Sequence, residues 1–139
     1  MNPLFSGSCE VVRDALWKNI YIPTQLYKAV KTNDFIRLTK IKQLGPTSLV
    51  YPSATHTRAA HSFGVYHVAT MILERLLACG ANEWITDSGS RAFVAAAFFH
   101  DLGHFPFTHS LKELPLREHE NLTAQQIMQN PLYDIIGAW

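Results

Sequence analysis

A regular apolar repeat between Arg58 and Cys79 limits this part of the chain to one secondary structure. Its members recur at steps of three and four residues: His61, Val65, Val68, Ile72 and Leu76. Such spacing places the side chains on one stripe of an α-helix. The sequence therefore predicts a long helix over Arg58 to Cys79 that stops at Gly80. The same stripe predicts that His61 projects from the core-facing side of this helix.

A second helix is predicted from Arg91 to about Leu102, where Gly103 ends it. One of three polar residues is expected to cap its start: Asp87, Ser88 or Ser90. Four side chains align along it: Phe93, Ala96, Ala97 and His100. Asp101 lies beside this stripe, and the several alanines permit close approach of a neighbouring helix. The two longest predicted helices thus each carry a histidine on an apolar stripe.

Shorter elements are predicted on either side of these helices. Upstream lie a strand or extended arm over 20–23, a helix over 24–30 capped by Thr24, a helix over about 32–41 and an extended piece over 49–51. Downstream, a brief helical segment near Leu111 precedes a last helix that begins at Thr123 or nearer His119. The expected fold class is all-α and mainly helical, with minor short strands near the N-terminus.

Composition limits the partners and the compartment. With 12 basic and 11 acidic side chains among 139 residues, the net charge of +1 gives no general attraction to nucleic acid or an anionic membrane. The length suits one domain with a real core, and no linker or repeat divides it. Two distant cysteines, Cys9 and Cys79, are typical of reduced thiols, and neither a signal peptide nor a membrane-length apolar span is recognised. The sequence predicts a cytoplasmic protein without a membrane segment.

Seven histidines are many for this length, and six fall in two clusters: His56, His61 and His67, then His100, His104 and His109. An imidazole on an apolar stripe needs a hydrogen bond or a metal ion, and a buried carboxylate at Asp101 needs a partner. A divalent ion held by His61, His100 and Asp101 answers both needs, since this mixed donor set suits Mn²⁺, Fe²⁺, Mg²⁺, Zn²⁺ or a similar ion. The alternatives are structural histidines and an Asp101 that caps a turn or pairs with Arg58 or Arg91.

Two segments carry a family resemblance: THTRAAHSFGVYHVA at 55–69 and AAFFHDLGHFPFTHSL at 96–111. They resemble the HD-domain phosphohydrolases, most closely the branch of deoxynucleoside triphosphate triphosphohydrolases. The likeness extends back through FIRLTKIKQLG and LVYP and forward to the His119-Glu120 pair, so that it covers most of the chain from about Ile20 to Met128. A histidine-aspartate pair alone is a weak signal, whereas HDLGHFPFTH downstream of TR..HS.GV is a specific combination. The resemblance implies an HD-type helical bundle that holds a divalent metal ion.

The resemblance also implies roles for individual residues. His61, His100 and Asp101 would be metal ligands, and Arg58 would contact a substrate phosphate. Three further histidines resemble those that line the site, bind phosphates or transfer protons: His104, His109 and His119. The implied partner is a nucleotide substrate. The implied reaction is attack of metal-activated water on phosphorus, which releases a deoxynucleoside and triphosphate.

The chain departs from the family pattern in several places. Asp134 is the only aspartate after Asp101, and its surroundings differ from those of the family's second metal-binding aspartate, so that role is not carried over to it. Residues 14–18, DALWK, replace the family's Asp-Pro-Val-His-Gly, and Ala59-Ala60 stand where the family often has Phe-Glu. The chain ends on the apolar residues 135–139, as a core helix cut short or a surface for a partner would. We expect one HD-type domain over 1–139, incomplete at its C-terminal side.

These departures leave three hypotheses for the function. The first is a metal-dependent phosphohydrolase acting on a deoxynucleoside triphosphate, because three protein ligands and water still hold a metal ion. The second is a catalytically impaired module that binds metal or nucleotide without turnover, which the missing aspartate favours. The third is a helical interaction domain with structural histidines, whose apolar C-terminus would form the interface of a homo-oligomer.

Overall fold

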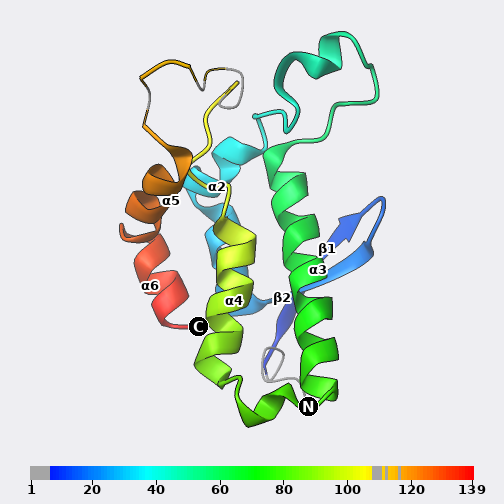
Figure 1. The fold of residues 1–139 in the computed structure, drawn as a ribbon, viewed down its shortest axis with the longest axis vertical. Helices are drawn as coiled ribbons and strands as arrows, with labels where there is room; N and C mark the ends of the chain where they lie inside the picture. Colours follow the sequence, from blue (N-terminus) through cyan, green and yellow to red (C-terminus); the bar gives the residue numbers. More distant parts are fainter. Residues whose placement is uncertain (1–6, 108–110, 112, 116) are drawn as a thin grey trace.

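The computed structural model describes residues 7–107, 111, 113–115 and 117–139 of the chain. Two helices that run in opposite directions, α3 (Arg58–Ala78) and α4 (Asp87–Phe99), form its centre (Figure 1). A β-hairpin lies along α3, and the C-terminal helices lie on the side of α4. The prediction of a mainly helical fold with short strands near the N-terminus is confirmed.

The hairpin consists of β1 (Cys9–Asp14) and β2 (Lys18–Pro23), which pair in antiparallel register. Asp14 shapes the turn between them, because its Oδ1 accepts hydrogen bonds from the N–H groups of Leu16 at 2.8 Å and Trp17 at 3.0 Å. The predicted extended arm over 20–23 is therefore part of β2, whereas β1 was not foreseen from the sequence. Inward-facing side chains of β2 are fully buried and anchor the hairpin to the core: Ile20 and Ile22.

Four short elements connect the hairpin to α3: α1 (Thr24–Tyr27), the 3-10 turn η2 (Lys28–Lys31), α2 (Asn33–Leu38) and the 3-10 turn η3 (Gly45–Leu49). The start predicted for α2 is confirmed, since Thr32 caps it by accepting a hydrogen bond from the Phe35 N–H. The predicted Thr24 cap is wrong, because the Thr24 hydroxyl donates to the Ser8 carbonyl instead. Residues 49–51 are not extended, since η3 and a following turn occupy them.

The two long helices have well-defined ends. Thr57 caps α3 by accepting a hydrogen bond from the Ala60 N–H, and Gly80 follows the helix with a φ of 92°. The predicted extent of α3 is confirmed. The helix α4 begins earlier than predicted because Thr86, rather than a later polar residue, caps it by accepting from the Gly89 N–H. A 3-10 turn, η4 (Ala81–Glu83), joins the two helices.

The buried face of α3 differs from the predicted one. Core positions lie one residue along from the apolar stripe: Ala59, Ser62, Tyr66, Ala69 and Leu73. Val68 is 37% exposed and Ile72 48% exposed, so the prediction that this stripe faces the core is wrong. Small side chains on the buried face allow close packing. Two of its hydroxyl groups donate hydrogen bonds, Tyr66 to the Tyr21 carbonyl at 3.0 Å and Thr70 to the His67 carbonyl at 2.7 Å.

The C-terminal helices are α5 (His119–Ile127) and α6 (Leu132–Gly137), separated by a cis Asn130–Pro131 bond. Leu132 is fully buried, and three further apolar side chains pack against the same core: Ile135, Ile136 and Trp139. The apolar C-terminal residues thus pack in part against the molecule's own core. The helical segment predicted near Leu111 falls largely outside the described residues. Within the described part of the chain, no helix combines the length and apolar character needed to cross a membrane.

Candidate active site

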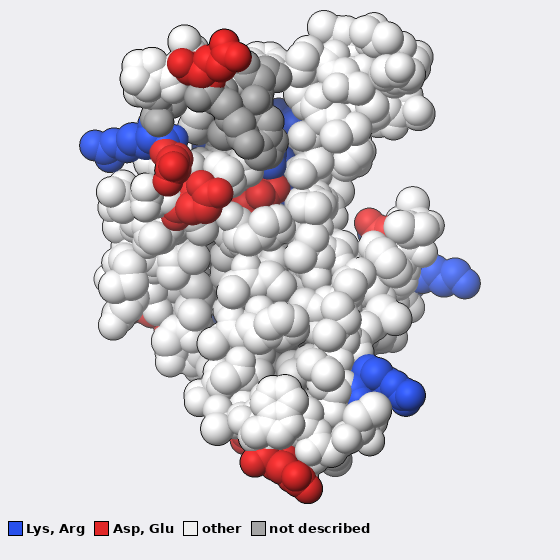
Figure 2. All heavy atoms as spheres, viewed as in Figure 1, with Lys and Arg blue, Asp and Glu red and all other residues white. Residues whose placement is uncertain are grey.

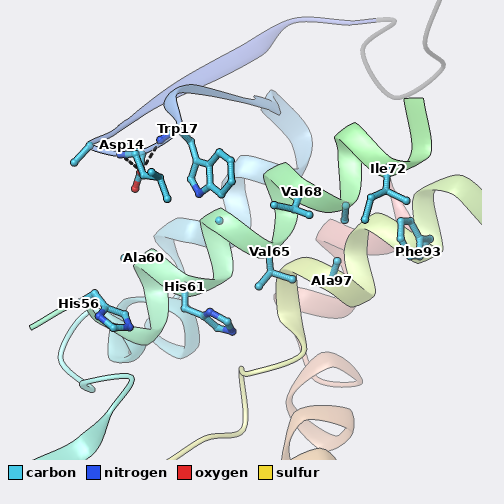
Figure 3. A pocket seen from close by; sticks show the side chains of 14 residues that line it. Asp14, Trp17, His56, Ala60, His61, Val65, Val68, Ile72, Phe93 and Ala97 are labelled. Atoms are coloured by element: carbon cyan, nitrogen blue, oxygen red, sulfur yellow. Dashed lines mark hydrogen bonds between the residues drawn. The ribbon is translucent and has the colours of Figure 1, made fainter. Parts of the chain in front are cut away.

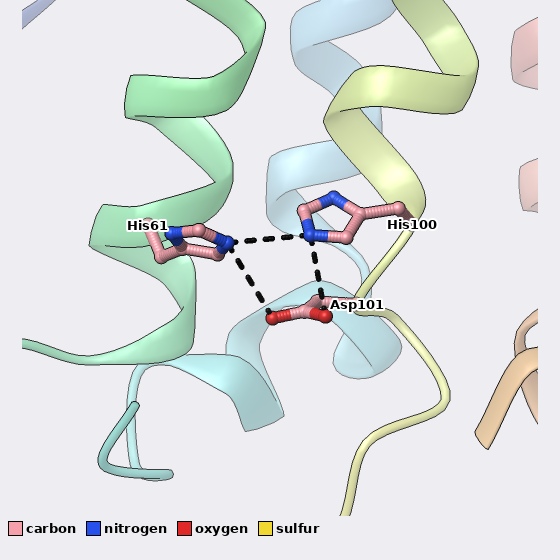
Figure 4. A group of neighbouring side chains, drawn as sticks. All are labelled: His61, His100 and Asp101. Atoms are coloured by element: carbon pink, nitrogen blue, oxygen red, sulfur yellow. Dashed lines mark hydrogen bonds and ion pairs between the residues drawn. The ribbon is translucent and has the colours of Figure 1, made fainter. Parts of the chain in front are cut away.

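The candidate site lies where the start of α3 meets the end of α4 (Figure 4). Because the helices run in opposite directions, His61 in the first turn of α3 faces His100, which caps the C-terminal end of α4. Asp101 follows in the next turn of the chain and points between the two rings. The structure therefore brings together the three residues that the sequence predicted as metal ligands.

The donor atoms of these three residues surround one point. His61 Nε2 lies 3.3 Å from His100 Nε2, and Asp101 Oδ1 lies 3.3 Å from His100 Nε2. A longer separation, 3.9 Å, joins His61 Nε2 and Asp101 Oδ2. One nitrogen from each imidazole and one carboxylate oxygen all lie within 4.8 Å of one another. Two imidazoles and a carboxylate form a donor set suited to a divalent transition metal ion.

The ring of His100 is held in the orientation that a ligand needs. Its Nδ1 lies 2.9 Å from the carbonyl oxygen of Ala97. Since a carbonyl only accepts, Nδ1 carries the proton and Nε2 keeps its lone pair toward Asp101 and His61. Metal-binding histidines commonly donate their other N–H to a backbone carbonyl in this way. The local geometry of α4 therefore leaves Nε2 of His100 free to accept a proton or bind a metal ion on the side of the cluster.

Asp101 forms the buried side of the site. Arg58 Nη1 donates to Asp101 Oδ2 at 2.7 Å, and His104 Nε2 lies 3.1 Å from Asp101 Oδ1. Burial alone would raise the pKa of Asp101, but the hydrogen bond from His104 and the positive charges nearby outweigh it and hold the pKa well below its usual range. The carboxylate is thus ionised, and each oxygen has lone pairs left for a metal ion.

Arg58 lies deeper than a simple surface contact to phosphate would suggest. Its side chain is 3% exposed and pairs with Asp101, which is 6% exposed. The pairing of these two residues, one of the alternatives left open by the sequence, is therefore present. Arg58 Nε has no hydrogen-bond partner among the described residues. A buried guanidinium with a donor to spare beside the site is compatible with an anionic ligand.

Two of the three remaining predicted histidines stack beside the cluster. The rings of His104 and His119 have centroids 3.7 Å apart and planes 24° apart. His119, on α5, also places Nε2 3.2 Å from Glu120 Oε1. Burial lowers the pKa of His104, and the hydrogen bond to Asp101 opposes this shift. His109, the third, lies outside the described residues.

Close approach of α5 to the turn after α4 makes this stack possible. A Cβ atom on Gly103 would lie 2.3 Å from the His119 carbonyl and 2.4 Å from the Thr123 N–H nitrogen, so only glycine fits. The Thr123 hydroxyl accepts from the Gly103 N–H at 2.8 Å and lies 3.2 Å from the His100 carbonyl, to which it donates. The sequence had suggested Thr123 as a helix cap, and this role in the site was missed.

Arg37 is a second residue of the site that was not foreseen. It lies on α2, and its Nη1 and Nη2 donate to the carbonyl oxygens of His104 and Leu102. Its position inside the family-like segment FIRLTKIKQLG was the only signal, because no local pattern ties a residue of α2 to a turn so far along the chain. Both Arg37 and Thr123 hold the backbone of the turn that carries Asp101.

An apolar groove of about 720 Å³ adjoins the cluster and shares His61 with it (Figure 3). Its walls come from the hairpin turn, α3 and α4, and include Trp17, Val65, Val68, Ile72 and Phe93. A Cβ on Gly64 would lie 3.1 Å from Trp17 Nε1, so the missing side chain lets the indole lie against α3. The predicted stripes of α3 and α4 thus line this groove in part, with Phe93 and Ala97 from the stripe of α4. In the view of Figure 1, few charged side chains lie across the middle of the molecule (Figure 2).

The family model described as HD domain matches residues 58–136, more than half of the chain. Over 120 residues the chain is 36% identical to the uncharacterized protein YwfO of Bacillus subtilis, covering 86% of this chain and 27% of YwfO. It is 33% identical to the deoxynucleoside triphosphate triphosphohydrolase SAMHD1 homolog of Dictyostelium discoideum, covering 76% of this chain and 20% of that protein. The chain therefore spans about a quarter of the length of these relatives.

A solved structure has a similar fold. The crystal structure of a phosphohydrolase from Bacteroides thetaiotaomicron superposes with a TM-score of 0.81 at 33% sequence identity. The match covers 93% of this chain and 33% of that one. The arrangement of α3, α4 and their neighbours is thus shared with a part of a larger phosphohydrolase.

Proposed function

The chain belongs to the HD-domain family, and we propose that it is a metal-dependent phosphohydrolase that cleaves deoxynucleoside triphosphates into deoxynucleoside and triphosphate. The observation that carries this proposal is the convergence of His61, His100 and Asp101 on one point. The relatives support the substrate class, since those of Dictyostelium discoideum and Danio rerio bear the name deoxynucleoside triphosphate triphosphohydrolase.

The residues fit a divalent ion for three reasons. Their donor set is two imidazole nitrogens and a carboxylate, the Ala97 carbonyl fixes the tautomer of His100, and Asp101 is kept ionised. A bound divalent ion would acidify water and offset the charge on phosphoryl oxygens. Mn²⁺, Fe²⁺, Mg²⁺ and Zn²⁺ all remain candidates for this role.

The other predicted residues would act on the substrate. We assign phosphate contact to Arg58, through the guanidinium N–H groups that Asp101 leaves unused. We assign proton transfer and phosphate contact to His104, His109 and His119. Among the two that the structure describes, His119 is the more accessible, with a side chain 20% exposed against 1% for His104. His119 is therefore our candidate for protonating the leaving alkoxide.

The test is chromatographic. The purified chain is incubated with Mn²⁺ and each of the common deoxynucleoside triphosphates, and the products are separated and identified. We expect deoxynucleoside and triphosphate from the parent chain and none from Asp101→Ala. The matched control is Asp134→Ala, because Asp134 is an exposed aspartate on α6 outside the cluster.

Each outcome has a defined reading, provided that circular dichroism shows the variants to be folded. Product from the parent and the control, with none from Asp101→Ala, supports the proposal. A folded parent that binds Mn²⁺ but releases no product contradicts the proposed hydrolysis and leaves a binding module. Product made equally by Asp101→Ala would contradict the assignment of the site.

A further inference from the structure

We propose that Arg37 is a positioning residue for the metal site: its guanidinium, by bridging the carbonyl groups of Leu102 and His104, sets the orientation of the turn that carries Asp101. This inference deepens the proposed function and uses the same site. Arg37 has no contact with the three donor atoms, so any effect on them acts through the backbone of the turn.

Two backbone hydrogen bonds stabilise the turn from His100 to His104. Within it, the Leu102 N–H bonds to the Phe99 carbonyl at 3.0 Å, and the His104 N–H bonds to the Asp101 carbonyl at 3.0 Å. The carbonyls of Leu102 and His104 point out of the turn and are the two that Arg37 binds. Backbone carbonyls at a helix end need partners from elsewhere, and here one side chain supplies both.

The chemistry of arginine matches this task. A guanidinium presents N–H groups in a rigid planar fork, so two of its nitrogens reach two carbonyls at fixed spacing. A lysine ammonium is a single point charge on a flexible stem and cannot hold both carbonyls in the same geometry. The positive charge also lies at the C-terminal end of α4, where the helix dipole is negative.

Loss of Arg37 would affect both the backbone next to Asp101 and the residue whose ring contacts its carboxylate. Its two carbonyl partners belong to the residue after Asp101 and to His104, whose ring contacts Asp101 Oδ1. On the opposite side of the turn, Thr123 holds the Gly103 N–H. With Arg37 removed, the carbonyls of Leu102 and His104 lose this partner. Arg58 still bonds the Asp101 carboxylate and Thr123 still bonds the turn, but the backbone that carries Asp101 is held less firmly, and so is the direction of the carboxylate toward His61 and His100.

The experiment compares three variants with the parent: Arg37→Met, Arg37→Lys and, as the matched control, Arg75→Met. Arg75 is an exposed arginine in the last turn of α3, far along the helix from His61. Two properties are measured at a temperature at which every variant is folded. One is the affinity for Mn²⁺, by calorimetric titration. The other is the proton–nitrogen correlation spectrum of the histidine rings in metal-free protein.

We expect Arg37→Met to bind Mn²⁺ about 10- to 100-fold more weakly, as is usual when an outer partner of a metal ligand is removed. Its His100 and His104 ring resonances should move in metal-free protein. Arg37→Lys should recover part of the affinity, and Arg75→Met should match the parent. A merely structural role would lower the melting temperature of Arg37→Met without changing either readout in the folded protein.

A folded Arg37→Met or Arg37→Lys with parental affinity and parental ring resonances would overturn the inference. If Arg37→Met does not fold, the decision rests on Arg37→Lys in the same two measurements. If the parent itself binds no Mn²⁺, the proposed function fails, and the ring spectra of metal-free protein still decide the role of Arg37. The two proposals therefore fail in distinguishable ways.

Discussion

The two faces of α3 differ in hydrophobicity and in burial, and the more hydrophobic face is not the buried one. The face turned to the core carries alanine, serine, tyrosine and threonine beside one leucine, whereas the face turned to the groove carries Val65, Val68 and Ile72. The more hydrophobic face is thus the more exposed one. On α4 the same offset recurs, since Phe93 is 45% exposed while Val94 and Phe98 are fully buried.

Hydrophobic periodicity therefore predicts the helix correctly but does not predict which of its sides is buried. Burial depends on which neighbours cover a face, and here the hairpin and α2 pack against the side with small residues and Tyr66. The candidate site divides along the same line. Arg58 and Asp101 lie on the covered side with side chains 3% and 6% exposed, whereas His61, which lines the groove, and His100 are 34% and 38% exposed.

The largest expected effect concerns the two sides of the site. Asp101→Ala should lower the free energy of unfolding of the metal-free protein by about 3–5 kcal/mol, because it leaves the buried charge of Arg58 without its partner. His61→Ala should lower it by less than about 1 kcal/mol, since its side chain is a third exposed. Urea unfolding in the presence of a chelator measures both.

Asp101→Asn is the control for this pair. It removes the negative charge that pairs with Arg58 but keeps the volume of the side chain, so it separates loss of the ion pair from loss of packing. An equal loss of stability in Asp101→Ala and His61→Ala would show that the site does not divide into a covered and an open side. If both variants lose Mn²⁺ binding but only Asp101→Ala loses stability, both residues bind the ion and only the buried one also stabilises the fold.

The next effect concerns the two faces of α3 away from the site. Leu73 is 2% exposed, so Leu73→Ala should lower the free energy of unfolding by about 2–5 kcal/mol. Ile72→Ala removes a side chain that is 48% exposed and should cost less than about 1 kcal/mol. The two substitutions are adjacent and similar in size, so each serves as the control for the other.

Urea unfolding at two protein concentrations measures this pair. If Ile72→Ala costs as much as Leu73→Ala, and the cost grows with protein concentration, the groove is covered by a second copy in solution. A large cost that is independent of concentration would contradict the exposed groove face of α3.

The smallest effect concerns the pH dependence of the groove-side ligand. Burial lowers the pKa of His61 below its ordinary value of 6.5, with the neighbouring charge of Asp101 opposing the shift. A metal ligand must be deprotonated, so a lowered pKa keeps the His61 contribution intact as the pH falls to 6.5. We expect the ratio of Mn²⁺ affinities between the parent and His61→Ala to be constant from pH 8 to about 6.5 and to narrow at most tenfold per unit at lower pH.

Calorimetric titration of both proteins across this range provides the measurement, and taking the ratio removes the titration of groups that the two proteins share. A ratio that already narrows above pH 6.5 would show that His61 titrates as an ordinary or raised histidine. That result would contradict the lowering of the His61 pKa by burial.

Much of the local structure could be predicted because its causes are local. The extent of α3 follows from its three- and four-residue repeat and from Gly80, and the start of α2 follows from Thr32. The start of α4 was predicted too late because several neighbouring polar residues are able to cap a helix, and the one that does so is Thr86. The strand β1 was not predicted, because it is stabilised by hydrogen bonds to β2 and its own residues carry no strong strand pattern.

The sequence by itself determined which three residues are the candidate metal ligands: two histidines on helical stripes and an aspartate beside one of them suit a divalent ion, and the family-like segments point to the same three residues. Only the tertiary structure decided that Arg58 pairs with Asp101, that Arg37 and Thr123 hold the turn, and that both apolar stripes line part of a groove. The physical reason is that periodicity and caps act over one helical turn, whereas burial and ion pairing depend on elements that the chain brings together from far apart.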